Sequence, residues 1–359
     1  MGLDRISLFA FRNHLASRLD GTGHLNLLTG ENGAGKTNVL EALSLLAPGR
    51  GLRRAALTEM AASGGPGGFA ISADLAGEGE PVRLGTGVEA AQPGRRLVQV
   101  NGAAKSAISL GEWLAISWLT PAMDRLFAEA AGARRRYMDR LAVALDPVHA
   151  KRAVRYETAL RERNRMLSAQ DEPDPRWFDA IEGQLAGAGA ALAQGRLSLI
   201  ERLTAELAHL PDQPFARPGL AYVPGGPLDP AALARALAGN RHRDRAAQRT
   251  LIGPHRDELE VTMAGKGEPA AQCSTGEQKA MLIAMTLAHA ALAAGERPGV
   301  LLLDEVAAHL DPVRRAALFE RLQDGKAQTW ITGTETAPFE GIAGDAVNWR
   351  VTAGEVARL

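Results

Sequence analysis

The chain has 359 residues, of which 46% are hydrophobic, and its 41 basic residues balance 41 acidic ones. This length exceeds that of a typical single domain, so we expect two domains or one domain with a large insertion. A formal net charge of zero excludes recognition of a partner by bulk charge, so a nucleic-acid surface would need local clusters of basic residues.

The cysteine content and the hydropathy pattern limit where the protein works. A single cysteine, Cys273, excludes a disulfide within the chain and fits a reducing compartment. The N-terminal residues lack the apolar core of a signal peptide, and no apolar run approaches the roughly 20 residues of a membrane span. We therefore expect a soluble, cytoplasmic protein without a membrane partner.

The first 115 residues are rich in predicted strands. Apolar residues at 6, 8, 9 and 11 and the run at 25–28 each predict a strand. Residues 69–75 alternate with a period of two, and residues 97–100 lead into Asn101-Gly102, a strong two-residue hairpin signal. The glycine-rich segment 64–68 predicts a loop.

A phosphate-binding loop follows the run at 25–28 and opens a helical pattern. In this strand–loop–helix context, glycines let backbone N–H groups turn toward an anion, and the helix dipole favours phosphate. We expect Lys36 to reach the β- and γ-phosphates of a nucleoside triphosphate, and the Thr37 hydroxyl to bind Mg²⁺. The loop has the form G-x-x-x-x-G-K-[ST] and consists of Gly30, Glu31, Asn32, Gly33, Ala34, Gly35, Lys36 and Thr37.

Residues from about 120 to 210 predict helices. Asp146-Pro147 predicts a helix start, followed by apolar residues at helical spacing over about seven turns. The segment 171–175 interrupts the pattern, a second long helical pattern follows, and Leu210-Pro211 ends it. The two helices predict an antiparallel hairpin. Helices packed in a globular bundle explain the spacing equally well, and the sequence leaves open whether the hairpin projects.

From about residue 250, strands and helices alternate again. The apolar run at 300–303 predicts a buried parallel strand, which ends in Asp304-Glu305. Beside a phosphate loop, a carboxylate at a strand end predicts a second Mg²⁺ anchor through Asp304, with Glu305 placed to polarise the attacking water. The pattern as a whole predicts one α/β domain interrupted by a helical insertion.

A further helix is predicted to begin after Ser274. Glu277 stands where a capping box requires it, so the motif is explained by a well-capped helix alone. The alternative is a second anion site, because a helix N-terminus presents free N–H groups and a positive dipole end to phosphate.

Four motifs in this order resemble the ATP-binding-cassette (ABC) head shared by transporters and by DNA-repair and chromosome-structuring ATPases: residues 30–37, 274–279, 301–305 and 309–311. The resemblance implies an α/β fold with an ABC-type P-loop ATPase head at 1–115 and 250–359 and an inserted helical domain at 116–249. It also implies that Ser274 and Gly276 of one chain close onto ATP held by a second chain, with Asp311 at the junction. ATP would thus join a homodimer.

Further segments resemble the RecF family, and this resemblance covers essentially the whole chain. It implies a DNA-binding protein of recombinational repair, replication-fork maintenance and the SOS response, with the RecR and RecO proteins as partners. By likeness, Arg12 and Asn13 lie against the adenine and ribose of ATP. The segments are Phe11-Arg12-Asn13, Trp118-Leu119-Thr120-Pro121, residues 134–139 and residues 253–257.

Two departures from the cassette pattern predict slow ATP hydrolysis, and for a DNA-binding ATPase we expect DNA to stimulate it. The segment 116–121 lacks the glutamine that contacts Mg²⁺ or water in many cassette ATPases. The strand at 329–334 offers threonine where transporters have a histidine that senses the γ-phosphate.

Three other classes compete with this interpretation. A transporter ATPase subunit is disfavoured by the large helical insertion and by the sequence STGEQK at 274–279, which departs from the transporter form LSGGQ. A chromosome-structuring ATPase would need a long coiled coil, and sustained heptads are missing here. A nuclease of the overcoming-lysogenization type would need a further metal-binding domain, for which the residues after Asp311 are too few.

Clusters of arginine and lysine predict a DNA-binding face that contacts phosphates without sequence preference. A solvated helix face explains any single arginine better. Aromatic residues make up only 4% of the chain, which favours contact with the backbone of duplex or junction DNA over base stacking. His255 and Arg256 could instead belong to the nucleotide interface. The basic residues stand at 134, 135, 136, 140, 151, 152, 155, 161, 163 and 165, and again at 241, 243, 245, 249 and 256.

Overall fold

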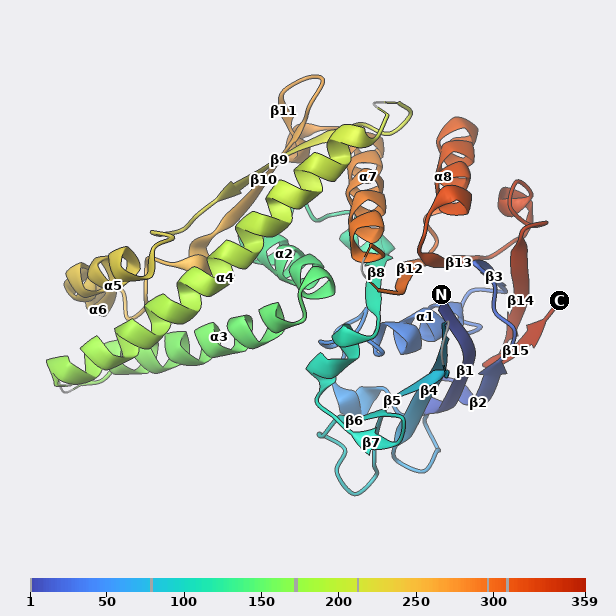
Figure 1. Cartoon of the computed structure of the whole chain (residues 1–359), viewed down its shortest axis with the longest axis horizontal. Helices are drawn as coiled ribbons and strands as arrows, with labels where there is room; N and C mark the ends of the chain where they lie inside the picture. Colours follow the sequence, from blue (N-terminus) through green and yellow to red (C-terminus); the bar gives the residue numbers. More distant parts are fainter. Residues whose placement is uncertain (1, 78–79, 171–173, 212, 296, 308–309) are drawn as a thin grey trace. The chain divides into compact units, whose positions relative to one another are not determined.

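The computed structural model describes residues 2–77, 80–170, 174–211, 213–295, 297–307 and 310–359 (Figure 1). The chain divides into two compact units. Unit 1 comprises Met1–Asp124, Leu210–Ala216 and Lys279–Leu359, and unit 2 comprises Arg125–His209 and Arg217–Gln278. Unit 2 is thus inserted into the sequence of unit 1.

The boundaries of these units differ from the expected ones at 115/116 and 249/250. Strand β8 (Ala115–Leu119) pairs with β12 (Gly299–Leu303), so unit 1 extends past residue 115. Strand β10 (Glu258–Met263) pairs with β9 (Pro218–Val223), so unit 2 extends past residue 249. As an assignment of functional domains, the three-part division stays a prediction.

Unit 1 contains an antiparallel sheet in the strand order β2-β1-β4-β5-β6-β7. Its last hairpin turns at Asn101 and Gly102, whose φ angles of 49° and 79° confirm the predicted two-residue turn. The strands are β1 (Gly2–Phe11), β2 (His14–Leu19), β4 (Phe69–Ala76), β5 (Val82–Val88), β6 (Leu97–Val100) and β7 (Ala103–Ala104).

A second sheet of unit 1 has the order β15-β14-β3-β13-β12-β8. All its neighbours run parallel except β14 and β15, which confirms the predicted parallel strand at 300–303. All five residues of β12 are buried, as a strand covered on both faces requires. The other strands are β3 (Leu25–Thr29), β13 (Gln328–Gly333), β14 (Ala346–Thr352) and β15 (Glu355–Arg358).

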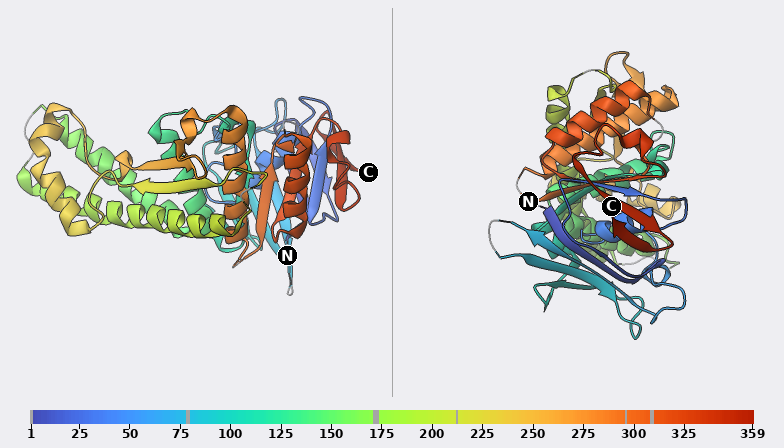
Figure 2. Two further views of the ribbon diagram at one scale, coloured as in Figure 1. Left: turned by 90° about the horizontal axis from the view of Figure 1, so that it is seen from above. Right: turned by 90° about the vertical axis from the view of Figure 1, so that its right-hand side faces the viewer.

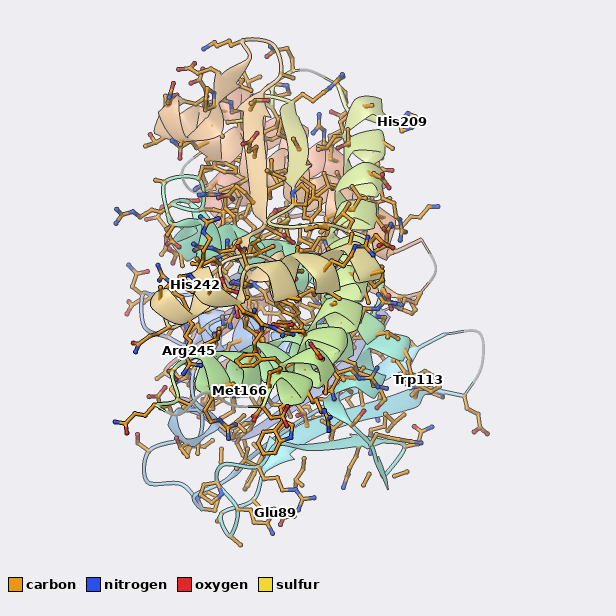
Figure 3. The ribbon with its side chains drawn as sticks, turned by 90° about the vertical axis from the view of Figure 1, so that its left-hand side faces the viewer. Glu89, Trp113, Met166, His209, His242 and Arg245 are labelled. Carbon is orange, nitrogen blue, oxygen red and sulfur yellow. The ribbon has the colours of Figure 1, made fainter. Side chains whose placement is uncertain are left out.

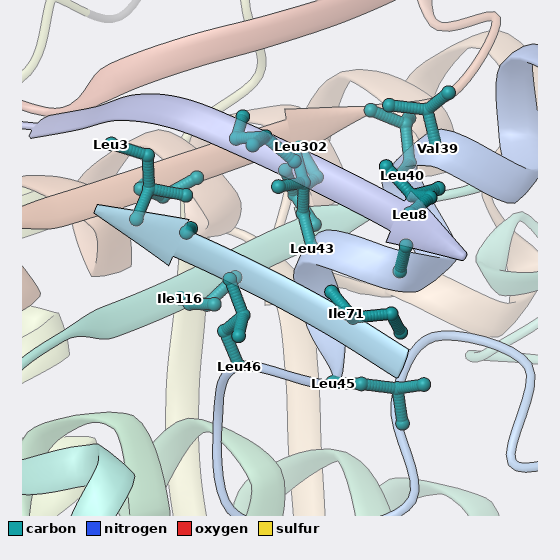
Figure 4. Packing of buried hydrophobic residues seen from close by; sticks show 14 of the residues in the cluster. Leu3, Leu8, Val39, Leu40, Leu43, Leu45, Leu46, Ile71, Ile116 and Leu302 are labelled. Carbon is teal, nitrogen blue, oxygen red and sulfur yellow. The ribbon is translucent and has the colours of Figure 1, made fainter. Parts of the chain in front are cut away.

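Helix α1 (Lys36–Ser44) lies within the main core of unit 1. Val39, Leu40 and Leu43 are fully buried against side chains that come from both sheets (Figure 4). Burying each such side chain contributes roughly 1.5–3 kcal/mol, so the packing fixes α1 and the loop before it. Helix α8 (Pro312–Asp324) also belongs to unit 1, whereas α7 (Thr275–Ala293) begins in unit 2 and continues into unit 1 from Lys279.

Unit 2 is built on a pair of long helices, α3 (Val148–Leu167) and α4 (Pro175–His209), which lie side by side where α3 ends and α4 begins (Figures 1 and 2). An added Cβ at Gly189 would contact Tyr156 of α3, and one at Gly195 would contact His149, earlier in α3. The later residue of α4 thus contacts the earlier residue of α3, so the two helices run antiparallel. This confirms the predicted antiparallel hairpin. Residues 171–173 of the predicted break lie outside the described residues.

The start and the length of α3 differ from expectation. Pro147, not Asp146, takes the N-cap position, one residue later than predicted, although Asp146 Oδ1 still accepts the Val148 N–H (3.0 Å). With 20 residues, α3 makes about five and a half turns rather than seven.

The remaining elements of unit 2 pack around this pair. Leu233 and Leu237 from the neighbouring helix join Tyr156 and Leu185 in a second hydrophobic core. The described residues include no helix that is long and apolar enough to span a membrane. The elements are α2 (Ala131–Leu145), α5 (Pro230–Gly239), α6 (Arg241–Ala246) and a sheet of order β11-β10-β9, in which β11 is Glu268–Pro269.

Candidate nucleotide-binding site

The predicted phosphate loop connects β3 to α1 through backbone conformations that favour glycine. Gly30, Gly33 and Gly35 have φ angles of 156°, 81° and 118°. A Cβ at Gly30 would lie 2.2 Å from the carbonyl oxygen of Val351, so the close approach of β14 also requires glycine there. Gly35 precedes α1, and no side chain caps the helix, which leaves its first N–H groups available to an anion.

Lys36 is folded back over this loop. The residue is only 4% exposed, and its ammonium donates to the carbonyl oxygens of Gly30 (2.7 Å) and Glu31 (2.8 Å). The positive charge is therefore held at the loop that was predicted to receive phosphates, with the loop's own carbonyls as its acceptors.

Thr37 and Asp304 meet at the carboxyl end of the parallel sheet. The Thr37 hydroxyl donates to Asp304 Oδ1 (2.9 Å), although 267 residues separate the two in sequence. Asp304 is 6% exposed, and its own N–H donates to Leu119 O (3.0 Å) at the end of β8. The hydroxyl and carboxylate oxygens form the hard donor pair that Mg²⁺ prefers, so these two residues fit the predicted metal anchor.

Thr332, at the end of β13, links this pair to Glu305. Its hydroxyl donates to Asp304 Oδ1 (2.9 Å) and accepts the Glu305 N–H (2.9 Å). Glu305 has a φ of 54°, a left-handed conformation that costs a non-glycine residue about 1–2 kcal/mol. Sequence reasoning noted a threonine in this strand only as a substitute for histidine. Sequence reasoning therefore missed that Thr332 bridges Asp304 and Glu305. The signal that could have indicated this role was a threonine within a buried strand of the same sheet as the acidic strand end.

Arg12 and Asn13 lie beside the loop, on the turn between β1 and β2. Arg12 donates to both carboxylate oxygens of Glu41 (2.8 and 2.9 Å), and Asn13 Nδ2 donates to Ala34 O (2.9 Å). Glu41 is fully buried in α1 and also accepts from Arg53 (2.9 Å). Sequence reasoning missed Glu41 as the buried acceptor for Arg12 and Arg53. The signal in the sequence was a single carboxylate among the apolar residues of a predicted helix.

The predicted capping box at the start of α7 is confirmed. The Glu277 N–H donates to Ser274 Oγ (3.3 Å), and the Ser274 N–H donates to Glu277 Oε2 (2.9 Å). An ion pair with Lys266 and the bonds from Ser274 lower the pKa of Glu277 to about 2. Ser274, Thr275 and Gly276 are exposed, so the backbone at this helix N-terminus is accessible in unit 2.

Asp311 caps α8. Its Oδ1 accepts the Arg314 N–H (2.9 Å), and Pro312 takes the first helical position, where its missing N–H costs nothing. The Asp311-Pro312 pair signals this cap in the sequence, and sequence reasoning did not use it. His309 of the predicted motif lies outside the described residues.

Much of the predicted basic surface is engaged inside unit 2. Arg163 is fully buried between Glu182 and Asp244, Arg134 pairs with Glu258, and Arg241 pairs with Glu182. The prediction that these three arginines belong to an exposed DNA face is therefore wrong. A pattern of charges in the sequence cannot reveal which arginines form ion pairs with carboxylates. Of the residues in the two predicted clusters, the exposed ones are Arg136, Lys151, Arg155, Arg161, Arg165, Arg243, Arg249 and Arg256.

His255 also has an internal role. Its Nε2 lies 2.8 Å from Thr250 O and must therefore donate, so Nδ1 accepts from the Tyr156 hydroxyl (2.7 Å). Burial lowers the pKa of His255. Nearby, α6 with His242 and Arg245 lies beside the end of α3 that carries Met166 (Figure 3), and Arg245 donates to Ala169 O (3.4 Å).

A phosphate loop after one strand of a parallel sheet and an acidic pair at the end of another define unit 1 as a P-loop ATPase head of the ABC type. The family model "RecF/RecN/SMC N terminal domain" matches residues 2–346. "DNA replication and repair protein RecF" of Mesorhizobium japonicum is 47% identical over 99% of this chain and 97% of its own length. The Brucella suis protein of that name is 46% identical over 99% and 96%. This chain therefore belongs to the RecF family of DNA replication and repair proteins.

Solved structures agree with the fold. A RecF–ATP structure from the RecFOR pathway superposes with a TM-score of 0.87 at 23% identity, covering 100% of this chain and 97% of that one. A head domain of the Smc protein of Pyrococcus furiosus has a TM-score of 0.56 at 14% identity, covering 100% and 96%. Membership of the RecF family also excludes the transporter ATPase subunit that the sequence had left as an alternative.

Proposed function

We propose that this chain is an ATP-driven DNA clamp. Two chains that have bound ATP pair head to head, grip gapped, single-stranded or duplex DNA, and separate after slow, DNA-stimulated hydrolysis. The clamp acts in recombinational repair and replication-fork maintenance in the SOS response, with RecR and RecO as partners, and works in the cytoplasm. The observation that carries the proposal is the Thr37–Asp304 hydrogen bond, because it joins the phosphate loop to the acidic strand end.

The residues of the loop would bind the triphosphate. Gly30, Gly33 and Gly35 orient backbone N–H groups toward it, while Lys36 exchanges the carbonyls of Gly30 and Glu31 for phosphate oxygens. Glu31, Asn32 and Ala34 complete the loop. Arg12 and Asn13, held by Glu41 and by Ala34 O, border the loop where a nucleoside would extend.

Thr37 and Asp304 would hold Mg²⁺. Bound there, the ion would neutralise charge that develops on the phosphates. Glu305 follows Asp304 directly and would orient the attacking water and accept its proton. Support for this role comes from the Thr332 hydroxyl, which fixes the Glu305 backbone beside Asp304.

The second half of the site would come from the partner chain. Ser274 and Gly276 lie exposed at the N-terminus of α7, where free N–H groups and the dipole favour a γ-phosphate. Asp311 would lie at the same junction, while it also caps α8.

Sedimentation velocity tests the clamp. Glu305→Gln should bind ATP and remain dimeric with duplex DNA at least about tenfold longer than the unchanged chain, because the water is no longer activated. Ser274→Ala should bind ATP but stay monomeric. Glu335→Gln, an exposed change in the same unit, is the control and should behave as the unchanged chain does. A Glu305→Gln chain that stays monomeric with ATP and DNA would contradict the clamp.

Replacing Thr332 by valine keeps the shape of a fully buried side chain but removes its two hydrogen bonds. We expect ATP turnover to fall about tenfold, since Glu305 loses its backbone anchor, while the Kd for ATP changes less than about threefold. Steady-state turnover and equilibrium nucleotide titration separate the two effects. Thr334→Val, at an exposed position two residues on, serves as the control. Unchanged turnover in Thr332→Val would show that the bridge plays no part in hydrolysis.

A further inference from the structure

The turn between β14 and β15 lies against the phosphate loop. Ala353 and Gly354 form this two-residue turn, with φ angles of 48° and 86°. The Gly354 N–H donates to Ala34 O (2.9 Å), and Asn13 Nδ2, on the turn between β1 and β2, donates to the same oxygen (2.9 Å). Two turns that belong to different sheets thus hold one carbonyl group of the loop.

His14 holds the next carbonyl group of the loop. The residue is fully buried at the start of β2, and its Nε2 lies 3.0 Å from Gly35 O. Because a carbonyl oxygen can only accept, Nε2 donates in this hydrogen bond. Ser17 connects the histidine to the β14–β15 turn, since its Oγ lies 2.9 Å from His14 Nδ1 and its hydroxyl donates to Gly354 O (2.8 Å). The turn therefore reaches both carbonyl groups, one directly and the other through two buried side chains.

Glycine at two positions allows these close approaches. A Cβ at Gly354 would lie 2.0 Å from Asn13 O, and a Cβ at Gly35 would lie 2.8 Å from His14 Nε2. Both glycines also have φ angles that other residues rarely adopt, 86° and 118°. A side chain at either position would push the loop and the turns apart.

The direction of each held carbonyl group determines the direction of the N–H group that follows it. In a planar trans peptide the two groups point to opposite sides, so the contacts at Ala34 O and Gly35 O turn the N–H groups of Gly35 and Lys36 away from the two turns. Neither N–H group donates to an atom of the described residues. Unpaired N–H groups at the start of a helix are the groups with which a phosphate loop binds phosphate oxygens.

We propose that Gly354 and His14 are positioning residues of the phosphate loop, which hold its carbonyl groups away from the triphosphate and so present its N–H groups to the phosphates. The proposal rests on the proposed nucleotide site. The Gly354 contact has the larger effect, because Ala34 O lies outside the helix, whereas Gly35 O also accepts the Val39 N–H of α1 (3.2 Å). The C-terminal hairpin thus acts on ATP binding through the loop.

Equilibrium titration of the full-length chain with ATP tests the turn through Gly354→Ala. The added Cβ moves the turn away from Asn13 and breaks the bond to Ala34 O, so we expect ATP affinity to fall at least about tenfold. Gly102→Ala is the matched control. Gly102 also ends a two-residue hairpin turn, has a similar φ of 79°, and a Cβ there would have no neighbour within 4 Å. The control should bind ATP within about twofold of the unchanged chain.

A pair of changes at His14 separates the hydrogen bond from packing. His14→Gln keeps an N–H donor near the position of Nε2, whereas His14→Leu fills a similar volume without a donor. We expect His14→Leu to weaken ATP binding at least about fivefold and His14→Gln to restore it to within about twofold of the unchanged chain. Thermal unfolding checks that each variant is folded at the temperature of the titration.

Each outcome decides a different statement. If Gly354→Ala binds ATP as tightly as Gly102→Ala does, the role of the turn is overturned. If the two His14 variants bind ATP equally, the role of the His14 hydrogen bond is overturned, and this pair still tests the proposal when Gly354→Ala does not fold. An unchanged chain that binds no ATP overturns the proposed nucleotide site itself, and the positioning role with it.

Discussion

Replacing Lys36 by alanine is expected to weaken ATP binding at least about 100-fold and to abolish the ATP-dependent pairing of two chains. Lys36 supplies the positive charge at the loop, and its Nζ lies within 2.8 Å of the Gly30 and Glu31 carbonyls. Two charge-assisted hydrogen bonds to phosphate at about 1.5 kcal/mol or more each account for a loss of about 3 kcal/mol in binding.

Isothermal titration with ATP and sedimentation with ATP and DNA measure the two effects of this change. Lys326→Ala is the matched control, because Lys326 is an exposed lysine of the same unit, away from the loop. The variant should keep its fold, since the carbonyls that lose Lys36 gain access to water. Retention of ATP affinity within threefold would rule out Lys36 as a phosphate ligand.

Replacing Arg163 by alanine is expected to lower the free energy of unfolding of unit 2 by about 3–5 kcal/mol. Arg163 is fully buried and donates to Glu182 Oε1 (2.9 and 3.1 Å) and to Asp244 Oδ2 (2.7 Å). It also donates to Thr250 Oγ1 (2.8 Å) and Leu237 O (3.0 Å). Removing it leaves two buried carboxylates with less compensation and opens a cavity where α3, α4 and α6 meet.

Hydrogen exchange read by mass spectrometry locates this loss in α3 and α4. Arg161→Ala is the control, because Arg161 is exposed two positions away on α3 and should change stability by less than about 0.5 kcal/mol. Unchanged protection of α3 and α4 in Arg163→Ala would mean that Glu182 and Asp244 find other partners, such as Arg241.

The parts of the site that sequence predicts well are those defined by local chemistry. The positive φ angles of the loop at 30, 33 and 35 favour glycine. An apolar run with Asp304 at its end describes a buried strand that presents a carboxylate. The antiparallel hairpin and the turn at Asn101-Gly102 follow from periodicity and turn chemistry in the same way.

The parts that sequence misses depend on pairing over long distances. Glu41 appears in sequence as a polar interruption of a helix, and only the fold shows that Arg12 and Arg53 neutralise it. Arg163 belongs to a run of basic residues that predicts an exposed face, yet it is the most deeply buried of them. The extension of unit 2 past residue 249 likewise depends on β10 pairing with β9, which no local pattern specifies.

The position of Lys36 has a consequence for how fast nucleotide can be exchanged. Because the ammonium already has two acceptors in the loop, an arriving triphosphate replaces existing hydrogen bonds instead of satisfying a bare charge. The net gain in binding is therefore smaller than the gross strength of the new contacts. We expect moderate affinity with rapid release, so that the supply of nucleotide in the cell, rather than slow dissociation, sets how often the protein reloads.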